Sequence, residues 1–276
     1  MKLALCNEVL RHLPFAEQCR LAAAIGCSGL EVAPFTVADD PEQLGDADAL
    51  RIRTIAADHG LSIPSLHWLL VQPPGLSIAT PDAALRQRTL DYLRRLIGFA
   101  AACGAGVLVH GSPAQRAPAP GQSVADALER CVDAWAQLAV DAARHGVVYC
   151  IEPLAPQETP VLNTLAQAAA IVDRIGSPAL RTMLDLSAAS RAEAEAPAEV
   201  LARFLGSGHV AHVQLNDRNR RGPGQGDTPV APVLRALHAA NYHGWIALEP
   251  FVYEPDPLAC AAASAAYARG IWEAIA

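Results

Sequence analysis

The segment VVYCIEPLAPQETPVLNTLAQAAAIVDRIGSPALRTMLDL, residues 147–186, contains the repeating unit from which the whole chain is built. It begins with a short apolar run rich in β-branched and aromatic residues, which predicts a strand over 147–153. An alanine-rich stretch predicts a helix over 164–175, and a second apolar run predicts another strand over 180–186. Two short apolar strands joined by a helix are typical of parallel pairing through a right-handed crossover.

The same unit recurs on both sides of this segment, so the chain of 276 residues is expected to alternate eight strands with eight helices. The predicted strands cover 3–7, 29–35, 61–68, 106–111, 147–153, 180–186, 209–217 and 245–251. The predicted helices cover 14–25, 46–59, 82–102, 123–145, 164–175, 195–205, 228–240 and 257–275. Eight such units predict an α/β fold, a single (β/α)8 TIM barrel over 1–276, because such a barrel needs about 250 residues. An open doubly wound sheet is the competing fold, but its glycine-rich dinucleotide motif is missing after the first strand.

Composition limits the classes of protein that fit the chain. The formal net charge is −7, which disfavours a nucleic-acid partner because phosphate binding needs a basic surface. The chain has no uncharged apolar run of about 18 residues and no signal peptide, so no membrane association is expected. The seven cysteines contain no C-x-x-C pair, which indicates buried free thiols and a cytoplasmic location.

Four oxygen-bearing side chains stand where four consecutive predicted strands end: Glu152, Asp185, Gln214 and Glu249. They recur about one β–α unit apart, and the ends of adjacent parallel strands lie about 4.8 Å from one another. Buried carboxylates that converge repel one another unless a divalent cation neutralises them. An all-oxygen donor set favours one Mg²⁺ or Mn²⁺ ion, with Co²⁺ or Zn²⁺ as alternatives. Ordinary structural ion pairs remain the other interpretation of these residues.

Two of the four side chains occur in matching contexts. Cys-Ile-Glu-Pro at 150–153 and Ala-Leu-Glu-Pro at 247–250 both end an apolar strand with Glu-Pro. A metal ion that polarises a carbonyl makes the neighbouring C–H acidic, and two carboxylates beside it can remove and return a proton. Glu152 and Glu249 are therefore the predicted catalytic acid–base pair.

At these motifs the chain resembles the xylose-isomerase-like family of sugar-phosphate isomerase and epimerase barrels. The resemblance spans nearly the whole chain and is carried by LHWLL (66–70), VLVHGSPAQR (107–116), IEPLAPQET (151–159), MLDLSAA (183–189), HVQLNDRNRRGPGQGD (212–227) and LEPF (248–251). It implies that Glu152, Asp185 and Glu249 bind the metal. Ketose 3-epimerases have a histidine ligand, in an H-x-H pattern, where this chain has Gln214. Hydroxypyruvate isomerases look similar here, because they have a glutamine ligand in a related H-x-Q strand.

The resemblance also implies residues that bind substrate. Glu158 and Arg220 match a substrate-binding glutamate and arginine of the 3-epimerases. His67 and His110 end predicted strands and are expected to face the barrel mouth, where they would contact substrate hydroxyls or serve as structural histidines. Ala188, three residues after Asp185, stands where the 3-epimerases have a histidine, which weakens the expectation of a ketohexose substrate.

The leading hypothesis is a metal-dependent isomerase or epimerase that acts on a small carbohydrate or keto acid through an enediolate. A dehydratase of a keto-sugar or keto-inositol shares the first proton abstraction and is an alternative. An apurinic-site endonuclease-like phosphodiesterase with three zinc ions is a second alternative, and a sugar-binding barrel without catalysis is a third. Related barrels often associate, so a homo-oligomer is a further expectation from the resemblance.

Overall fold

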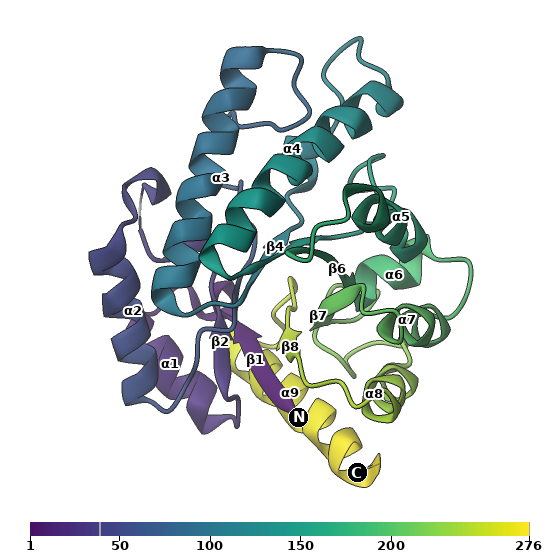
Figure 1. The fold of residues 1–276 in the computed structure, drawn as a ribbon. Helices are drawn as coiled ribbons and strands as arrows, with labels where there is room; N and C mark the ends of the chain where they lie inside the picture. Colours follow the sequence, from purple (N-terminus) through teal and green to yellow (C-terminus); the bar gives the residue numbers. More distant parts are fainter. Residues whose placement is uncertain (39, 276) are drawn as a thin grey trace.

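Eight parallel strands form a closed barrel at the centre of the computed structural model, which describes residues 1–38 and 40–275 (Figure 1). The strands are β1 (Lys2–Cys6), β2 (Gly29–Glu31), β3 (Ser65–Leu66), β4 (Val107–His110), β5 (Val148–Ile151), β6 (Leu180–Asp185), β7 (Val210–Leu215) and β8 (Trp245–Leu248). Their hydrogen-bonded order is β2-β1-β8-β7-β6-β5-β4-β3, and bridges from Gly29 to Ser62 and from Val32 to Leu66 close the ring. The predicted (β/α)8 barrel is confirmed.

Helices surround the barrel and lie close to their predicted positions (Figure 1). They are α1 (Phe15–Ala24), α2 (Asp46–Asp58), α3 (Ala83–Cys103), α4 (Val124–His145), α5 (Leu165–Ile175), α7 (Pro197–Leu205), α8 (Val230–Ala239) and α9 (Pro257–Ile275). The sequence did not predict the short helix α6 (Leu186–Ala192) or the 3-10 turns η1 (Asn7–Leu10), η2 (Pro34–Thr36), η3 (Pro41–Gln43) and η4 (Pro113–Arg116). Helix α6 begins directly after β6 because the Asp185 side chain accepts a hydrogen bond from the amide of Ala188 and caps it.

Two strands are shorter than predicted. The predicted strand over 29–35 ends at Glu31, and the one over 61–68 is reduced to the pair Ser65–Leu66. Pro34 and Pro64 lack the N–H that a strand ladder needs, so regular pairing cannot run through them.

Side chains alternate along the strands between the helix layer and the barrel interior. The main apolar core includes Leu5, Leu108, Ile151, Leu184 and Leu248 and lies between the strands and the helices. Small separate clusters contain Ala4, Cys6, Val109, Cys150, Met183 and Ala247, from the intervening positions. Because the period of a strand is two residues, the positions two beyond Val109, Cys150, Met183 and Ala247 also face the interior. Those positions are Gly111, Glu152, Asp185 and Glu249.

The cysteines and the helix lengths bear on two further expectations from the sequence. All seven cysteines are free and buried, as predicted. Among the helices within 1–38 and 40–275, none is long and apolar enough to cross a membrane.

The core assignment predicts a large loss of stability at Leu108. This residue of β4 is fully buried, so Leu108→Ala is expected to lower the free energy of unfolding by about 2–5 kcal/mol. Leu50→Ala on α2 is the matched control, because Leu50 is 63% exposed and should change stability by less than about 0.5 kcal/mol. Urea unfolding measures both values, and equal losses at the two positions would contradict the assigned core.

Candidate functional site

A cavity of 330 Å³ opens at the carboxyl ends of the strands. Its lining consists of Trp68, Val71, residues 111–115, Glu152, Leu154, Glu158, Arg220, Glu249 and Phe251. Three long loops that follow strands, 69–81, 111–122 and 215–227, all contribute to it. The carboxyl face is where barrels of this kind place their chemistry.

The strand register brings the four predicted metal ligands to this end of the barrel. Asp185 of β6 and Gln214 of β7 are direct register partners. Glu152 follows the last residue of β5, and Glu249 follows the last residue of β8. The amide of Glu249 donates to the carbonyl of Leu215 at 3.0 Å, which extends the ladder to the site. All four side chains are buried.

Burial keeps these carboxylates from ionising easily. It raises the pKa of Glu152 well above its usual range, and the charges of Glu249 and Asp185 raise it further. Burial also raises the pKa of Asp185 to about 6, although its hydrogen bonds act in the opposite direction. The pKa of Glu249 is raised by burial even though it has a hydrogen bond to His67. A cation among three such carboxylates would stabilise their ionised forms.

The amide of Gln214 offers a fourth oxygen. Its Nε2 donates to Glu31 Oε1 at 2.6 Å. Its Oε1 is buried and has no hydrogen-bond partner among the residues that the structure describes. A buried carbonyl oxygen left unpaired costs about 1–3 kcal/mol, so this unpaired oxygen fits the role of a ligand for a cation. Three carboxylates and one amide oxygen form the hard donor set that Mg²⁺ and Mn²⁺ prefer.

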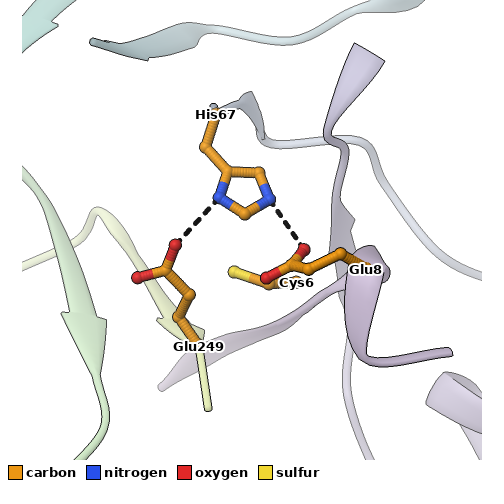
Figure 2. Close-up of side chains that lie close together, drawn as sticks. All are labelled: Cys6, Glu8, His67 and Glu249. Carbon is orange, nitrogen blue, oxygen red and sulfur yellow. Dashed lines mark hydrogen bonds and ion pairs between the residues drawn. The ribbon is translucent and has the colours of Figure 1, made fainter. Parts of the chain in front are cut away.

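His67 connects Glu249 to a carboxylate outside the predicted site (Figure 2). Its Nδ1 lies 3.1 Å from Glu249 Oε1, and its Nε2 lies 2.9 Å from Glu8 Oε2. Burial alone would lower the pKa of His67, but the neighbouring carboxylates raise it well above its usual value.

Together with Cys6, these residues come close enough to hold an ion. The two ring nitrogens of His67 point in opposite directions toward different carboxylates, however, so the ring bridges Glu8 and Glu249. His67 is fully buried and does not line the cavity. The geometry therefore favours a role in positioning the Glu249 carboxylate and disfavours the predicted contact with substrate.

The prediction that His110 faces the barrel mouth is wrong. Val109 faces the barrel interior, so its neighbour His110 faces the helix layer. There its Nδ1 lies 2.6 Å from the hydroxyl of Tyr149, and its ring packs edge-on against Trp135 of α4. Burial lowers the pKa of His110 to about 3. A buried, neutral histidine in this layer is in no position to contact substrate.

Glu158 and Arg220 both line the cavity, as their predicted role requires. Arg220 NH1 lies 3.3 Å from Glu158 Oε1, and Arg191 NH2 donates to Glu158 Oε2 at 2.9 Å. The Arg220 guanidinium also lies 4.3 Å from the centre of the Phe251 ring. The backbone carbonyl of Arg220 accepts the amides of Phe251 and Val252, which fixes the loop against the end of β8.

Several supporting residues were not predicted. Trp68 Nε1 donates to Glu249 Oε1 at 3.2 Å, and Asn216 Nδ2 donates to Asp185 Oδ2 at 2.6 Å. The fully buried Arg116 of η4 donates to the backbone oxygen of Glu152 at 2.6 Å. Arg116 ends the motif at 107–116, but no periodic pattern marks its role, whereas the signal for Asn216 was its place two residues after the predicted ligand Gln214.

The whole-chain pattern agrees with a known protein family. A family model described as "Xylose isomerase-like TIM barrel" matches residues 19–271. The chain belongs to this family.

Two relatives and one solved structure show how the family match extends along the chain. A protein of Streptomyces coelicolor named as a hydroxypyruvate isomerase is 31% identical, over 90% of this chain and 89% of its own. A protein of Synechocystis named as a ketose 3-epimerase is 26% identical, over 85% of this chain and 77% of its own. A crystal structure of D-psicose 3-epimerase in the presence of D-fructose superposes with a TM-score of 0.82 and 22% identity, covering 99% of both chains. At that identity, the superposition shows the shared fold alone.

Gly111 is predicted to be required for the position of Glu152. A Cβ added at Gly111 would overlap Glu152 Oε2, so Gly111→Ala must displace this carboxylate. We expect the variant to fold and to bind Mn²⁺ about 10–100-fold more weakly, as measured by electron paramagnetic resonance. Gly106→Ala, directly before β4, is the matched control, since a Cβ there meets nothing within 4 Å. Equal affinity in the two variants would contradict the assigned site.

Metal affinity should also depend on pH. The pKa of Asp185 is raised to about 6, so below that pH the protonated form predominates and is a poor ligand. The dissociation constant for Mn²⁺ is therefore expected to rise as the pH falls from about 7 to about 5, by up to about tenfold per pH unit for one competing proton. Titrations of Mn²⁺ at several pH values measure this, and affinity that stays constant across the range would contradict it.

Proposed function

We propose that the protein is a divalent-metal-dependent isomerase or epimerase of a small neutral ketose, working by proton transfer through an enediolate. The observation that carries the proposal is the presence of two buried glutamates, Glu152 and Glu249, in the lining of one cavity. They come from strands β5 and β8, which β6 and β7 separate, so they approach a bound substrate from different directions. The names of the family's relatives, ketose 3-epimerase and hydroxypyruvate isomerase, support the same class of reaction.

Glu152, Asp185, Gln214 and Glu249 would hold the metal ion in this proposal. When bound, a divalent cation supplies polarisation of the substrate carbonyl, which makes the adjacent C–H acidic. The orphaned oxygen of Gln214 and the raised pKa values of the three carboxylates support this assignment.

Different contacts hold the two glutamates in place. Glu249 Oε1 accepts from Trp68 and contacts His67, so this oxygen is fixed and Oε2 is left for the reaction. Glu152 is fixed through its backbone oxygen by Arg116, and its carboxylate lies against Gly111. Efficient general bases have pKa values raised toward the working pH, and burial raises both of these. We infer that one glutamate removes the proton from the substrate carbon and the other returns it.

The charges around the cavity favour a neutral substrate. Glu152, Glu158 and Glu249 line it, and Arg220 is the only cationic side chain among the lining residues that the structure describes. The guanidinium of Arg220 already pairs with Glu158, and the neighbouring Arg221 pairs with Glu254. An anion clamp formed by the arginines of this loop therefore lacks support. We propose that Glu158 and Arg220 bind substrate hydroxyls instead, as their counterparts in the resemblance do.

Hydroxypyruvate is the second candidate substrate, because the relative with that activity in its name is 31% identical over most of both chains. The carboxylate of hydroxypyruvate would need a cationic side chain that is not already paired, and this argues against hydroxypyruvate as the substrate. The endonuclease alternative has less support, because His110 faces the helix layer and cannot join a histidine cluster at the mouth.

The decisive test is hydrogen exchange at the reacting carbon. In D₂O with Mn²⁺, the wild-type protein is expected to incorporate deuterium into a neutral ketose such as D-psicose, D-fructose or D-tagatose. Glu152→Gln and Glu249→Gln should each reduce the exchange rate by at least about 100-fold, because each removes a proton-transferring group. Mass spectrometry of the products measures the exchange and also separates isomerisation, which conserves mass, from dehydration.

Glu129→Gln is the matched control, because Glu129 is an exposed residue that pairs with Arg174 away from the site. It should exchange deuterium at the wild-type rate. Undiminished exchange in both Glu152→Gln and Glu249→Gln would overturn the mechanism. Exchange with hydroxypyruvate and with none of the ketoses would replace the proposed substrate class with the second candidate.

A further inference from the structure

A glutamine can serve as a metal ligand only if its amide presents the oxygen. The two ends of the amide have nearly the same shape, but one carries two N–H donors and the other accepts. A metal cation attracts the oxygen and repels the N–H end. Something in the surroundings of Gln214 must therefore decide which end faces Glu152, Asp185 and Glu249.

Glu31 of β2 is the residue that contacts the N–H end of this amide. It is fully buried inside the barrel, where Gln214 Nε2 donates to its Oε1 at 2.6 Å. The thiol of Cys6 donates to the same oxygen at 3.2 Å. The other oxygen accepts from the hydroxyl of Ser65 and lies 2.6 Å from His212 Nε2.

The count of these contacts assigns Glu31 a supporting role. Each carboxylate oxygen has two lone pairs. Oε1 of Glu31 accepts two hydrogen bonds, from Gln214 and Cys6, so the oxygen that contacts the amide has no lone pair left for a metal ion. Oε2 accepts one hydrogen bond, from Ser65, and lies beside His212. The carboxylate of Asp185 differs, because each of its oxygens accepts a single hydrogen bond, from Ala188 or from Asn216.

The orientation of Gln214 follows from this arrangement. A carboxylate accepts and cannot donate when it is ionised, so a flipped amide would place its oxygen against the oxygen of Glu31 and repel it. In the observed orientation the Nε2 donors face Glu31, and Oε1 is the buried atom without a partner among 1–38 and 40–275. The amide thus has one favourable orientation before any ion arrives.

We propose that Glu31 is the positioning residue that turns the carbonyl oxygen of Gln214 toward the metal site. This inference rests on the proposed function, because it takes the metal site of that proposal as given. Glu31 acts through Gln214 and does not touch the ion or the substrate. Partners of this kind, behind the ligands themselves, typically change metal affinity by 10–100-fold when they are replaced.

A double-mutant cycle on Mn²⁺ affinity tests the inference without any enzyme assay. Glu31→Gln keeps the shape of the side chain but can offer a donor to Gln214, so Mn²⁺ affinity is expected to fall by about 10–100-fold. Gln214→Ala should cause a loss of its own. If Glu31 acts through Gln214, adding Glu31→Gln to Gln214→Ala changes the affinity by no more than about twofold. Losses that multiply in the double variant would overturn the inference and indicate a direct effect of the Glu31 charge.

Ser65→Ala is the matched control for disturbance of the Glu31 contacts. It removes a partner from the oxygen of Glu31 that does not contact Gln214, so Mn²⁺ affinity should stay within about threefold of the wild type. A loss as large as that of Glu31→Gln would overturn the inference, because orientation of the amide would not explain it. Thermal unfolding of every variant, measured in parallel, verifies that each one is folded.

The orientation can also be observed in the wild-type protein if Glu31→Gln does not fold. In glutamine-labelled protein, with Gln214 assigned by Gln214→Ala, Mg²⁺ should shift the side-chain ¹³Cδ signal and leave the Nε2 protons protected. Loss of that protection, or an unchanged ¹³Cδ signal, would overturn the inference while leaving metal binding established. Absence of any Mn²⁺ or Mg²⁺ binding in the wild type would overturn the proposed metal site together with the inference, so the two failures are distinguishable.

Discussion

Carboxylates buried at one end of a closed barrel impose the constraint on which the rest of the site depends. They include Glu8, Glu31, Glu152, Asp185 and Glu249. Carboxylates withdrawn from water in this way are tolerated only where donors or cations surround them. Glu31 accepts hydrogen bonds from Gln214, Cys6 and Ser65 and lies beside His212. Glu8 and Glu249 share His67 between them. Glu152, Asp185 and Glu249 keep unused lone pairs, which is the property that a metal site requires.

The barrel itself makes this concentration of charge possible. The residues beneath the site on the inward face include Ala4, Cys150 and Ala247, which leave room for the carboxylates and for the hydrogen-bonded layer around Glu31. Leucine and isoleucine occupy the alternate positions and pack against the helices, so the polar interior does not weaken the main core. Because the period of a strand is two residues, the apolar side chains that stabilise the fold face the helices, and the polar side chains of the site face the barrel interior.

The sequence predicted most of the fold because apolar strands and alanine-rich helices alternate with little interruption. It predicted four strand-end residues, Glu152, Asp185, Gln214 and Glu249, because register follows from regular spacing, and the structure buries all four at the carboxyl ends of the strands. It did not predict the elements that lack a regular pattern. Prolines shorten β2 and β3, and the side chain of Asp185 caps the short helix α6, which has no clear helical period in the sequence. His110 was misplaced because a strand end alone does not reveal whether a side chain faces inward or outward. The sequence included Arg116 in the motif 107–116 but did not indicate its role, because that role depends on the path of the turn η4.

Asp185 caps helix α6 and is also a residue of the proposed metal site, so a substitution at this position affects both. Its oxygens receive the amide of Ala188, which begins α6, and the amide of Asn216, which also contacts the carbonyl of Glu249. A replacement that cannot accept the amide of Ala188, such as Asp185→Ala, would remove the cap of α6 as well as a donor of the proposed metal site. A replacement of Gln214 would change a donor and the contact with Glu31 but would leave every helix cap in place. Substitution at the end of β6 therefore disturbs the backbone, whereas substitution at Gln214 disturbs side-chain contacts.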